Sequence, residues 1–497
     1  MEKESKHKRR ADKVLPGGGK SLFSDDSSLF FAFSLILTAL TCLLLPMKNV
    51  VMLRWYDEMS FFAPDLLPAM MHRPGGLLDY AGAFLTQFMF YPWLGSMMML
   101  VLWILLSYVV FRAFKLNGAF MPLAFLPAFC LMVEVLSFDE AWISLKSPGC
   151  LFSPSLGVLV SVLASWGGIL LSRRNVLVAV LYLALVACTY PLFGFYAVLA
   201  EGVCLISGIM TSFKEKNFKF AIPGIVGATL MAAVPYVYYY MWEGTVVDYH
   251  SLYIDGLPGF RIDIYDRYLW LPLFVMSGLL LVYSLVRGYK ARSKGAWTFC
   301  ATVYMLFGGY AFASGDNVSR QLRSVVAILP YVDHNQWQHV GYVMDHARCE
   351  PDLYMAIYDN MARQKLGLQM RQTNIPGDTL QPNPRKKGEL LGTVFLSVPA
   401  NYHLGKANSS YRWAMENTVA YGERIFYLKY MVRNALLNGE YKLAKKYNDR
   451  ILGSIFHRYW AEHYNKYIEN PESMAGSAEF NSISEYNPDV TFLEYGE

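Results

Sequence analysis

Two adjacent carboxylates, Asp57 and Glu58, follow the first long apolar stretch of the chain, and Arg54 stands just before them. A carboxylate just outside a membrane can act as a general base on an acceptor hydroxyl, or it can hold a divalent cation that neutralises a leaving phosphate. Asp57 and Glu58 are therefore the candidate catalytic residues, and Arg54 is a candidate for binding the substrate. An acidic pair in a polar loop is also often only a solvated surface, and this alternative stays open.

Charged residues in the same loop and in the next polar loop could complete such a site. Asp139 and Glu140 occupy the second loop, and a fold that gathered both loops would form an acidic cleft. One carboxylate would then serve as the base and another, Asp57 or Asp139, as the ligand of a divalent cation. His72 and Arg73 in the first loop would bind the phosphate of a lipid substrate.

One further carboxylate, Glu201, lies in the middle of an apolar stretch. Ionisable groups at membrane depth are costly and usually face an internal cavity or a partner, which makes Glu201 a candidate substrate-binding residue in a polar interior. The open alternative is a protonated Glu201 that donates a hydrogen bond to a neighbouring helix.

The elements that must position these residues are apolar stretches of the length needed to cross a bilayer, which is ~20 residues. Hydrophobic residues make up 54% of the chain and charged residues only 17%, which favours a membrane protein over a soluble one. We predict an all-α, polytopic membrane helix bundle of about nine spans. The predicted spans are 29–45, 89–111, 117–136, 151–171, 175–189, 191–210, 220–240, 268–286 and 297–313.

The positions of Lys and Arg orient the chain. Basic residues outnumber acidic ones before the first span, which predicts a cytoplasmic N-terminus. Every second joint between spans should then also be cytoplasmic, and each of these joints is basic. They carry Arg112 and Lys115; Arg173 and Arg174; Lys214, Lys216 and Lys219; and Arg287, Lys290, Arg292 and Lys294.

Three regions follow from this topology. Residues 1–28 are a basic cytoplasmic leader, residues 29–313 are a multi-span membrane domain with an external loop at 46–88, and residues 314–497 are an external helical domain. A cleaved signal peptide competes as an interpretation of residues 1–45, but residues 43–47 offer no small-x-small cleavage site. We expect the bacterial inner membrane, with the C-terminal domain in the periplasm.

The last third of the chain has helical patterns without membrane hydropathy. A turn at Asn438 and Gly439, followed by Tyr441 and the small Ala444, is typical of a tetratricopeptide-like hairpin. An unrelated helical bundle is the alternative, because a single good hairpin establishes no repeat. The predicted helices are 335–347, 351–366, 409–421, 423–437, 440–452 and 456–468, with an irregular segment at 368–405.

Composition argues against several other classes. The formal charge of +5 comes largely from the cytoplasmic joints, so it predicts no nucleic-acid partner. The seven cysteines include no C-x-x-C pair, and disulfides are not expected to be the framework. A divalent cation is the one cofactor that the acidic residues could use.

The segment 74–95, which runs from Pro74-Gly75-Gly76 through Leu85 to Tyr91-Pro92-Trp93, resembles a family of large uncharacterised multi-pass membrane proteins of Bacteroides-type bacteria. That resemblance implies a membrane half followed by a helical-repeat tail. The chain is also similar, more weakly, to membrane glycosyltransferases of the C-type fold, which use sugars on polyprenyl-phosphate carriers. Those enzymes place a carboxylate in the first external loop, a pattern that Asp57 and Glu58 match, and some carry tetratricopeptide-like tails.

The leading hypothesis is therefore a glycosyltransferase that takes a polyprenyl-phosphate-linked sugar at the external membrane face. A membrane-anchored scaffold for envelope assembly, with protein partners bound through residues 314–497, is the first alternative. A transporter or flippase is the second, although the two halves of the membrane domain show no repeated pair of interrupted spans. All three have the lipid bilayer as a partner.

Overall fold

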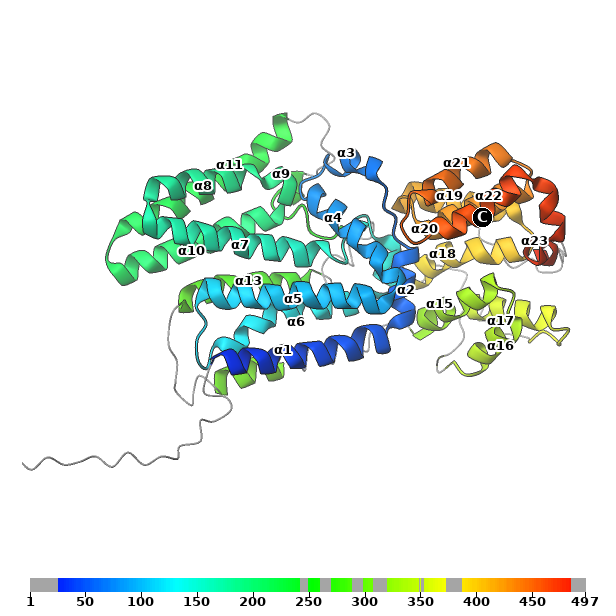
Figure 1. Ribbon diagram of the computed structural model, residues 1–497, viewed down its shortest axis with the longest axis horizontal. Coiled ribbons are helices and arrows are strands. Elements are labelled where there is room, and N and C mark those ends of the chain that lie inside the picture. Colours follow the sequence, from blue (N-terminus) through cyan, green and yellow to red (C-terminus); the bar gives the residue numbers. More distant parts are fainter. Residues whose placement is uncertain are drawn as a thin grey trace, which may run out of the picture.

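The computed structural model describes residues 26–241, 249–259, 270–287, 298–306, 320–347, 349, 353–371 and 387–483. Within these ranges the regular elements are helices, apart from isolated bridges such as the one between Asp255 and Leu257. Two helical bodies lie end to end along the long axis of the molecule (Figure 1). We call residues 26–306 the membrane half and residues 320–483 the tail.

Long apolar helices form most of the membrane half and run roughly along the same axis (Figure 1). Short helices between them form the end that faces the tail. The long elements are α1 (Asp26–Cys42, continued by the π-helical turn Leu43–Met47), α5 (Pro92–Phe114), α6 (Leu126–Leu136), α7 (Ser153–Arg174), α8 (Val176–Cys188), α10 (Phe195–Glu215), α11 (Ile222–Met241) and α13 (Leu271–Val286). The short elements include α2 (Val50–Glu58), α3 (Leu67–Met70), α4 (Gly76–Thr86) and α9 (Tyr190–Phe193).

The predicted count of about nine spans is wrong for the described residues, where five helices are long and apolar enough to cross a membrane. These are Asp26–Met47, Pro92–Phe114, Ser153–Arg174, Phe195–Glu215 and Phe218–Met241. Their presence is compatible with a membrane protein.

Three other predicted spans form shorter apolar helices, Met121–Leu136, Val176–Cys188 and Leu271–Val286. The helix α8 has 13 residues, which makes it about 20 Å long against the ~30 Å of a hydrocarbon core. The Asn175 side chain caps its start by accepting hydrogen bonds from the backbone N–H groups of Leu177 and Val178. For the ninth predicted span, only residues 298–306 are described, and they are helical.

The basic joints gather at one end of the membrane half. There Asp26 Oδ1 accepts a hydrogen bond from the Gly118 N–H (2.8 Å), and Arg287 donates to the Ala113 carbonyl (3.0 Å). Lys214 donates to the carbonyl of Arg287 (3.0 Å). The tail lies at the opposite end (Figure 1).

The tail consists of helices that pack mainly on their neighbours in the chain. The helix α18 contradicts the predicted irregular segment 368–405, and α15 was not predicted. Gly439 has the positive φ (74°) that its turn requires, and the N–H of Glu440 reaches the Ala435 carbonyl in a Schellman arrangement (2.8 Å). The tail helices are α15 (Arg320–Asp333), α16 (Trp337–Asp345), α17 (Leu353–Lys365), α18 (Lys387–His403), α19 (Ala407–Tyr421), α20 (Ile425–Leu437), α21 (Tyr441–Leu452), α22 (Arg458–Glu469) and α23 (Ala478–Ile483).

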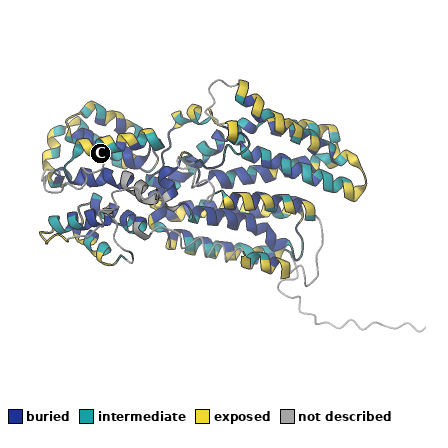
Figure 2. Ribbon diagram, turned by 180° about the vertical axis from the view of Figure 1, so that it is seen from behind, coloured by how far each residue is buried: buried dark blue, intermediate teal, exposed yellow. Residues whose placement is uncertain are grey.

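The two halves share a continuous apolar core at their junction. Helices α15 and α20 pack on α2, and Arg323 of α15 donates a hydrogen bond to the side chain of Asn49 (2.7 Å). Buried residues follow the inner helices and continue through the junction, while exposed residues lie on the outer faces (Figure 2). The predicted boundary at 313/314 lies outside the described residues, so the autonomy of the tail stays a prediction.

Candidate functional site

A cavity of about 340 Å³ lies at the junction of the two halves. It is lined by parts of 59–79, 145–153 and 255–259 from the membrane half, and by 421–424 from the tail. The first two ranges come largely from the two polar loops whose proximity the site hypothesis assumed, and these loops do meet here. The volume is in the range of small-molecule binding sites.

Glycines allow the loop backbones around this cavity to approach one another closely. Gly75 has φ +82°, and a Cβ atom on it would lie only 2.7 Å from the Cα atom of Gly256. Gly194 also has a positive φ, and beside it the N–H of Phe195 donates to the Asp255 carbonyl (2.8 Å). Side chains at these positions would push the loops apart, so the glycines fix the shape of the cavity.

Two carboxylates from different loops line the cavity, Asp79 of α4 and Asp255. Burial raises the pKa of Asp79 to about 6, although the Gly149 N–H donates to its Oδ1 (2.9 Å). Burial likewise raises the pKa of Asp255 to about 6. Its Oδ2 is buried and has no hydrogen-bond partner within the described part of the chain. Carboxyl groups with such pKa values can both accept and release protons near neutral pH.

Positive charge in the cavity comes from Arg73 and Lys146, whose side chains are exposed. The charge of Arg73 lowers the pKa of both Asp79 and Asp255, which offsets part of the effect of burial. Arg73 therefore acts electrostatically on both carboxylates. An exposed guanidinium at this place is well suited to bind a phosphate.

The tail closes one side of the cavity through Glu423 and Arg424. Arg424 is buried and donates to the carbonyls of Trp142 (3.1 Å), Ile143 (3.0 Å) and Leu145 (2.9 Å) in the second loop. Burial lowers the pKa of Arg424, since no carboxylate compensates its charge. Glu423 pairs with Arg450, which also pairs with Asp65 of the first loop.

The predicted catalytic residue Asp57 is not part of the cavity lining. It is 3% exposed, and its Oδ2 lies 2.9 Å from Nε2 of His457 in the tail. Burial raises the pKa of Asp57, and the hydrogen bond and charge of His457 offset part of that rise. Asp57 thus holds the tail against α2.

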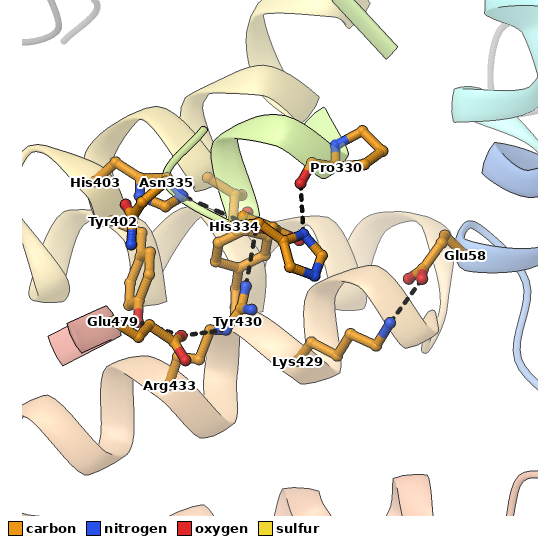
Figure 3. A network of polar contacts seen from close by, with 12 residues as sticks. Glu58, Pro330, His334, Asn335, Tyr402, His403, Lys429, Tyr430, Arg433 and Glu479 are labelled. Carbon is orange, nitrogen blue, oxygen red and sulfur yellow. Dashed lines mark hydrogen bonds and ion pairs between the residues drawn. The ribbon is translucent and has the colours of Figure 1, made fainter. Parts of the chain in front are cut away.

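Its neighbour Glu58 is bound by the tail as well, because Lys429 of α20 donates to its Oε1 (2.6 Å; Figure 3). Burial alone would raise the pKa of Glu58, but the charges of Lys429 and His457 outweigh it and hold the pKa below its usual value. Each member of the predicted acidic pair is therefore bound by a basic residue of the tail.

Figure 3 shows that α20 carries a second buried charge one turn after Lys429, the guanidinium of Arg433. Arg433 pairs with Asp333 (3.1 Å) and with Glu479 (3.1 Å), and the Tyr430 hydroxyl donates to Asp333 (2.8 Å). Burial would raise the pKa of Asp333, but Arg433 and His403 keep it far below its usual value. This network joins α15, α20 and α23 and so fixes α20 beneath α2.

The other predicted site residues are dispersed. Arg73 lines the cavity, whereas Arg54 and His72 are exposed and outside its lining. Glu201 is buried between α10 and α11, where its carboxylate lies against Gly227. The backbone of Asp139 and Glu140 forms the start of a 3₁₀ helix (Asp139–Ser144), but their side chains lie outside the described residues.

Sequence reasoning missed Asp79 and Asp255 as site residues. Both are close to glycines, since Gly75 and Gly76 precede Asp79 and Gly256 follows Asp255 directly. A carboxylate beside a glycine-bearing turn in an external loop was the available signal. In the part of the chain that the structure describes, no group of three or more His, Cys, Asp or Glu side chains could hold a metal ion.

Fold and site together define a class: a helical protein with several apolar helices long enough to cross a membrane, whose helical tail closes a charged cavity at one end of the apolar bundle. The chain belongs to a family of unknown function (DUF6057), whose family model matches residues 27–495. This confirms the expected membership of an uncharacterised family over nearly the whole chain. No curated protein matches the chain, and no solved structure matches it either.

Proposed function

We propose that the protein transfers a sugar from a polyprenyl-phosphate carrier to an acceptor hydroxyl, in the cavity at the junction of the membrane half and the tail. The observation that carries this proposal is the pair of carboxylates Asp79 and Asp255 beside the exposed Arg73. A base with a pKa near neutrality and a phosphate-binding cation are the two groups that glycosyl transfer from a lipid phosphate requires.

In this reaction the acceptor O–H loses its proton to Asp255 or Asp79, and the acceptor oxygen forms a bond to the anomeric carbon. The bond between that carbon and the phosphate oxygen breaks, and the electron pair stays on the phosphate. Arg73 and Lys146 would stabilise the charge that develops on this leaving group. Asp255 is the stronger candidate for the base, because its buried Oδ2 is without a partner among the described residues.

The proposal changes the role expected of Asp57 and Glu58. Their contacts with His457 and Lys429 suit positioning residues, which hold the tail so that Glu423 and Arg424 can close the cavity. A divalent cation, if one takes part, would have the cavity carboxylates as its ligands.

The finer parts of the assignment belong to the same proposal. We place the protein in the inner membrane of a Bacteroides-type bacterium, with the basic joints in the cytoplasm and the tail in the periplasm. The gathering of basic residues at the end opposite the tail supports this orientation. The hairpin of α20 and α21 supports a tetratricopeptide-like tail.

The test is an assay on the full-length protein in liposomes, with a panel of radiolabelled polyprenyl-phosphate-linked sugars and measurement of the polyprenyl phosphate released. Asp255→Asn and Asp79→Asn should fold normally, and loss of the base should reduce transfer by about 10²-fold or more. Asp449→Asn, at an exposed position of α21, is the matched control and should keep wild-type transfer. Full activity of both cavity variants would disprove the assignment of the base, and no release by the wild type with any sugar would favour the scaffold alternative.

A further inference from the structure

An exposed aromatic and aliphatic surface on the tail lies beside the start of the helix α5. The segment between α21 and α22 carries Ile455, which is 50% exposed, and Tyr459 at the start of α22 is 81% exposed. Exposed apolar side chains of this size on a soluble surface usually mark an interaction site.

Phe456 joins this segment to the outer end of α5. Its ring stacks on Phe90 (centroid distance 5.5 Å) and contacts Phe88 and Tyr91 edge to face (both 5.6 Å). The N–H of Ile455 also donates to the side chain of Gln87 (3.3 Å). The tail segment is therefore fixed beside the residues that precede Pro92, the first residue of a candidate membrane span.

The exposed face of that span continues directly from this point. Large apolar side chains recur at helical spacing along α5, which gives one continuous stripe. Its exposed members are Trp93, Leu94, Met97, Val101, Leu105 and Tyr108. In a membrane protein a stripe of this kind faces lipid, and the aromatic Tyr91 (55% exposed) and Trp93 (51% exposed) stand at the position of an interfacial belt.

We infer that residues 455–459 of the tail rest in the outer interface of the lipid bilayer. Their apolar side chains continue the surface by which α5 contacts lipid, and Tyr459 has the apolar ring and polar tip that favour the headgroup region. The neighbouring Arg458 has a side chain that is 66% exposed and pairs with the exposed Glu462 one turn later (2.9 Å), so its charge lies at the surface. This inference does not depend on the proposed sugar transfer.

The contact has a structural consequence. Directly after Phe456 comes His457, the partner of Asp57, so the segment that touches lipid is also one that holds the tail on α2. The bilayer surface would then help to fix the tail above the cavity. The partner is thus a lipid surface, and a soluble protein bound at the same residues is the competing outcome.

The test uses the full-length protein in lipid nanodiscs, in a background without Cys42, Cys188 and Cys349, which are the cysteines that are not buried among the described residues. Tyr459→Cys is labelled with an environment-sensitive fluorophore, and quenching by lipids with a spin label near the headgroup is measured. Tyr342→Cys on α16 is the matched control, because Tyr342 is also an exposed aromatic residue (63%) and α16 is far from α5. Ile455→Cys provides a second reporter if the first variant folds poorly.

The label at 459 or 455 should be quenched several-fold more strongly than the label at 342, and lipids with the spin label deep in the acyl chain should quench it less. Equal quenching at the tail segment and at 342 would overturn the inference. Quenching at 459 that appears only when the spin label is at the centre of the bilayer would also contradict an interfacial position.

Discussion

Two pairs of carboxylates lie at the junction of the molecule, and they differ in what surrounds them. Asp57 and Glu58 are adjacent in sequence, and each is bound by a basic residue of the tail. Asp79 and Asp255 are far apart in sequence, and both line the cavity, where burial raises their pKa values to about 6. A carboxylate bound directly by a basic side chain stabilises structure, whereas one that lines a cavity remains available for chemistry.

The comparison also separates two ways in which the tail contributes. Through His457 and Lys429 the tail binds the first pair and is held in place. Through Glu423 and Arg424 the same tail forms part of the cavity that contains the second pair. Changes at the first pair should therefore alter stability, while changes at the second should alter activity.

The largest effect on stability is expected at Arg424, which lines the cavity and also fastens the tail to the second loop. Arg424→Met keeps much of the side-chain volume but removes the donors to three buried carbonyls, so the protein should lose about 3–5 kcal/mol of unfolding free energy. Thermal unfolding followed by tryptophan fluorescence measures this loss. Arg412→Met is the control, because the Arg412 side chain is 64% exposed and its removal should cost less than about 0.5 kcal/mol. Equal stability of the two variants would show that the tail is not fixed through Arg424.

A double-mutant cycle tests the difference between the carboxylate pairs directly. Asp57→Ala and His457→Ala should be coupled by about 2 kcal/mol, because either change alone leaves a buried polar partner behind. Asp255→Ala combined with His457→Ala should be additive within about 0.5 kcal/mol. Chemical denaturation of the four proteins in each cycle gives both values. Additivity in the first cycle would contradict the structural role of Asp57.

The dependence of stability on pH distinguishes Glu58 from the two cavity carboxylates by its sign, whereas burial raises the pKa of Asp57 as it raises those of the cavity pair. The folded-state pKa values of Asp79 and Asp255 are raised from 3.8 to about 6, so the folded protein binds more protons than the unfolded chain over this interval. Their contribution is fully present below pH 3.8, falls as the pH rises to about 6, and changes little above it. The pKa of Glu58 is lowered, so Glu58 contributes in the opposite direction. Its contribution to the unfolding free energy is present above its usual pKa and is lost as the pH falls toward its lower folded-state pKa.

The corresponding experiment compares unfolding midpoints of the wild type and Asp255→Asn between pH 4 and pH 7. As the pH rises from 4 to 7, the variant should lose less unfolding free energy than the wild type. The difference between the two losses should be about 2 kcal/mol or less, because solvent screens part of the effect. Transfer by the wild type should rise through about pH 6, because the base must be deprotonated. Identical pH profiles of stability for the two proteins would show that Asp255 is not perturbed by its surroundings.

The sequence predicted those features that depend on local pattern. Apolar periodicity located most helices, and Asn438-Gly439 located the turn between α20 and α21 because a positive φ at Gly439 is a local requirement. The span count failed because hydropathy measures how apolar a segment is, while three of the apolar segments form helices of only 10–17 residues, shorter than a crossing of the bilayer needs.

The candidate site could be predicted only in part. Of the residues predicted from the first loop, Arg73 lines the cavity, and its role there stays a prediction. The partners of Asp57 and Glu58 come from positions 400 and 371 residues later. Six of the long helices separate Asp79 from Asp255 in the chain, although both residues line the cavity. No local pattern records contacts of that sequence separation, so the acidic pair looked free when it is bound.

The smallest expected effect is at Gly439, and it tests whether tail stability alone affects the cavity. Gly439→Ala forces a residue with a Cβ atom into φ 74°, so the tail should lose about 1 kcal/mol, although no atom would collide with the new methyl group. Gly476→Ala is the control, because Gly476 also has open space around it but no positive φ, and it should be neutral or slightly stabilising. Unfolding midpoints of the full-length proteins measure both.

Since Gly439 touches neither carboxylate pair, a loss this small leaves the tail folded and docked, and transfer should equal that of the wild type. If Gly439→Ala reduced transfer as strongly as Asp255→Asn, activity would depend on tail stability in general and the distinction between the two carboxylate pairs would fail.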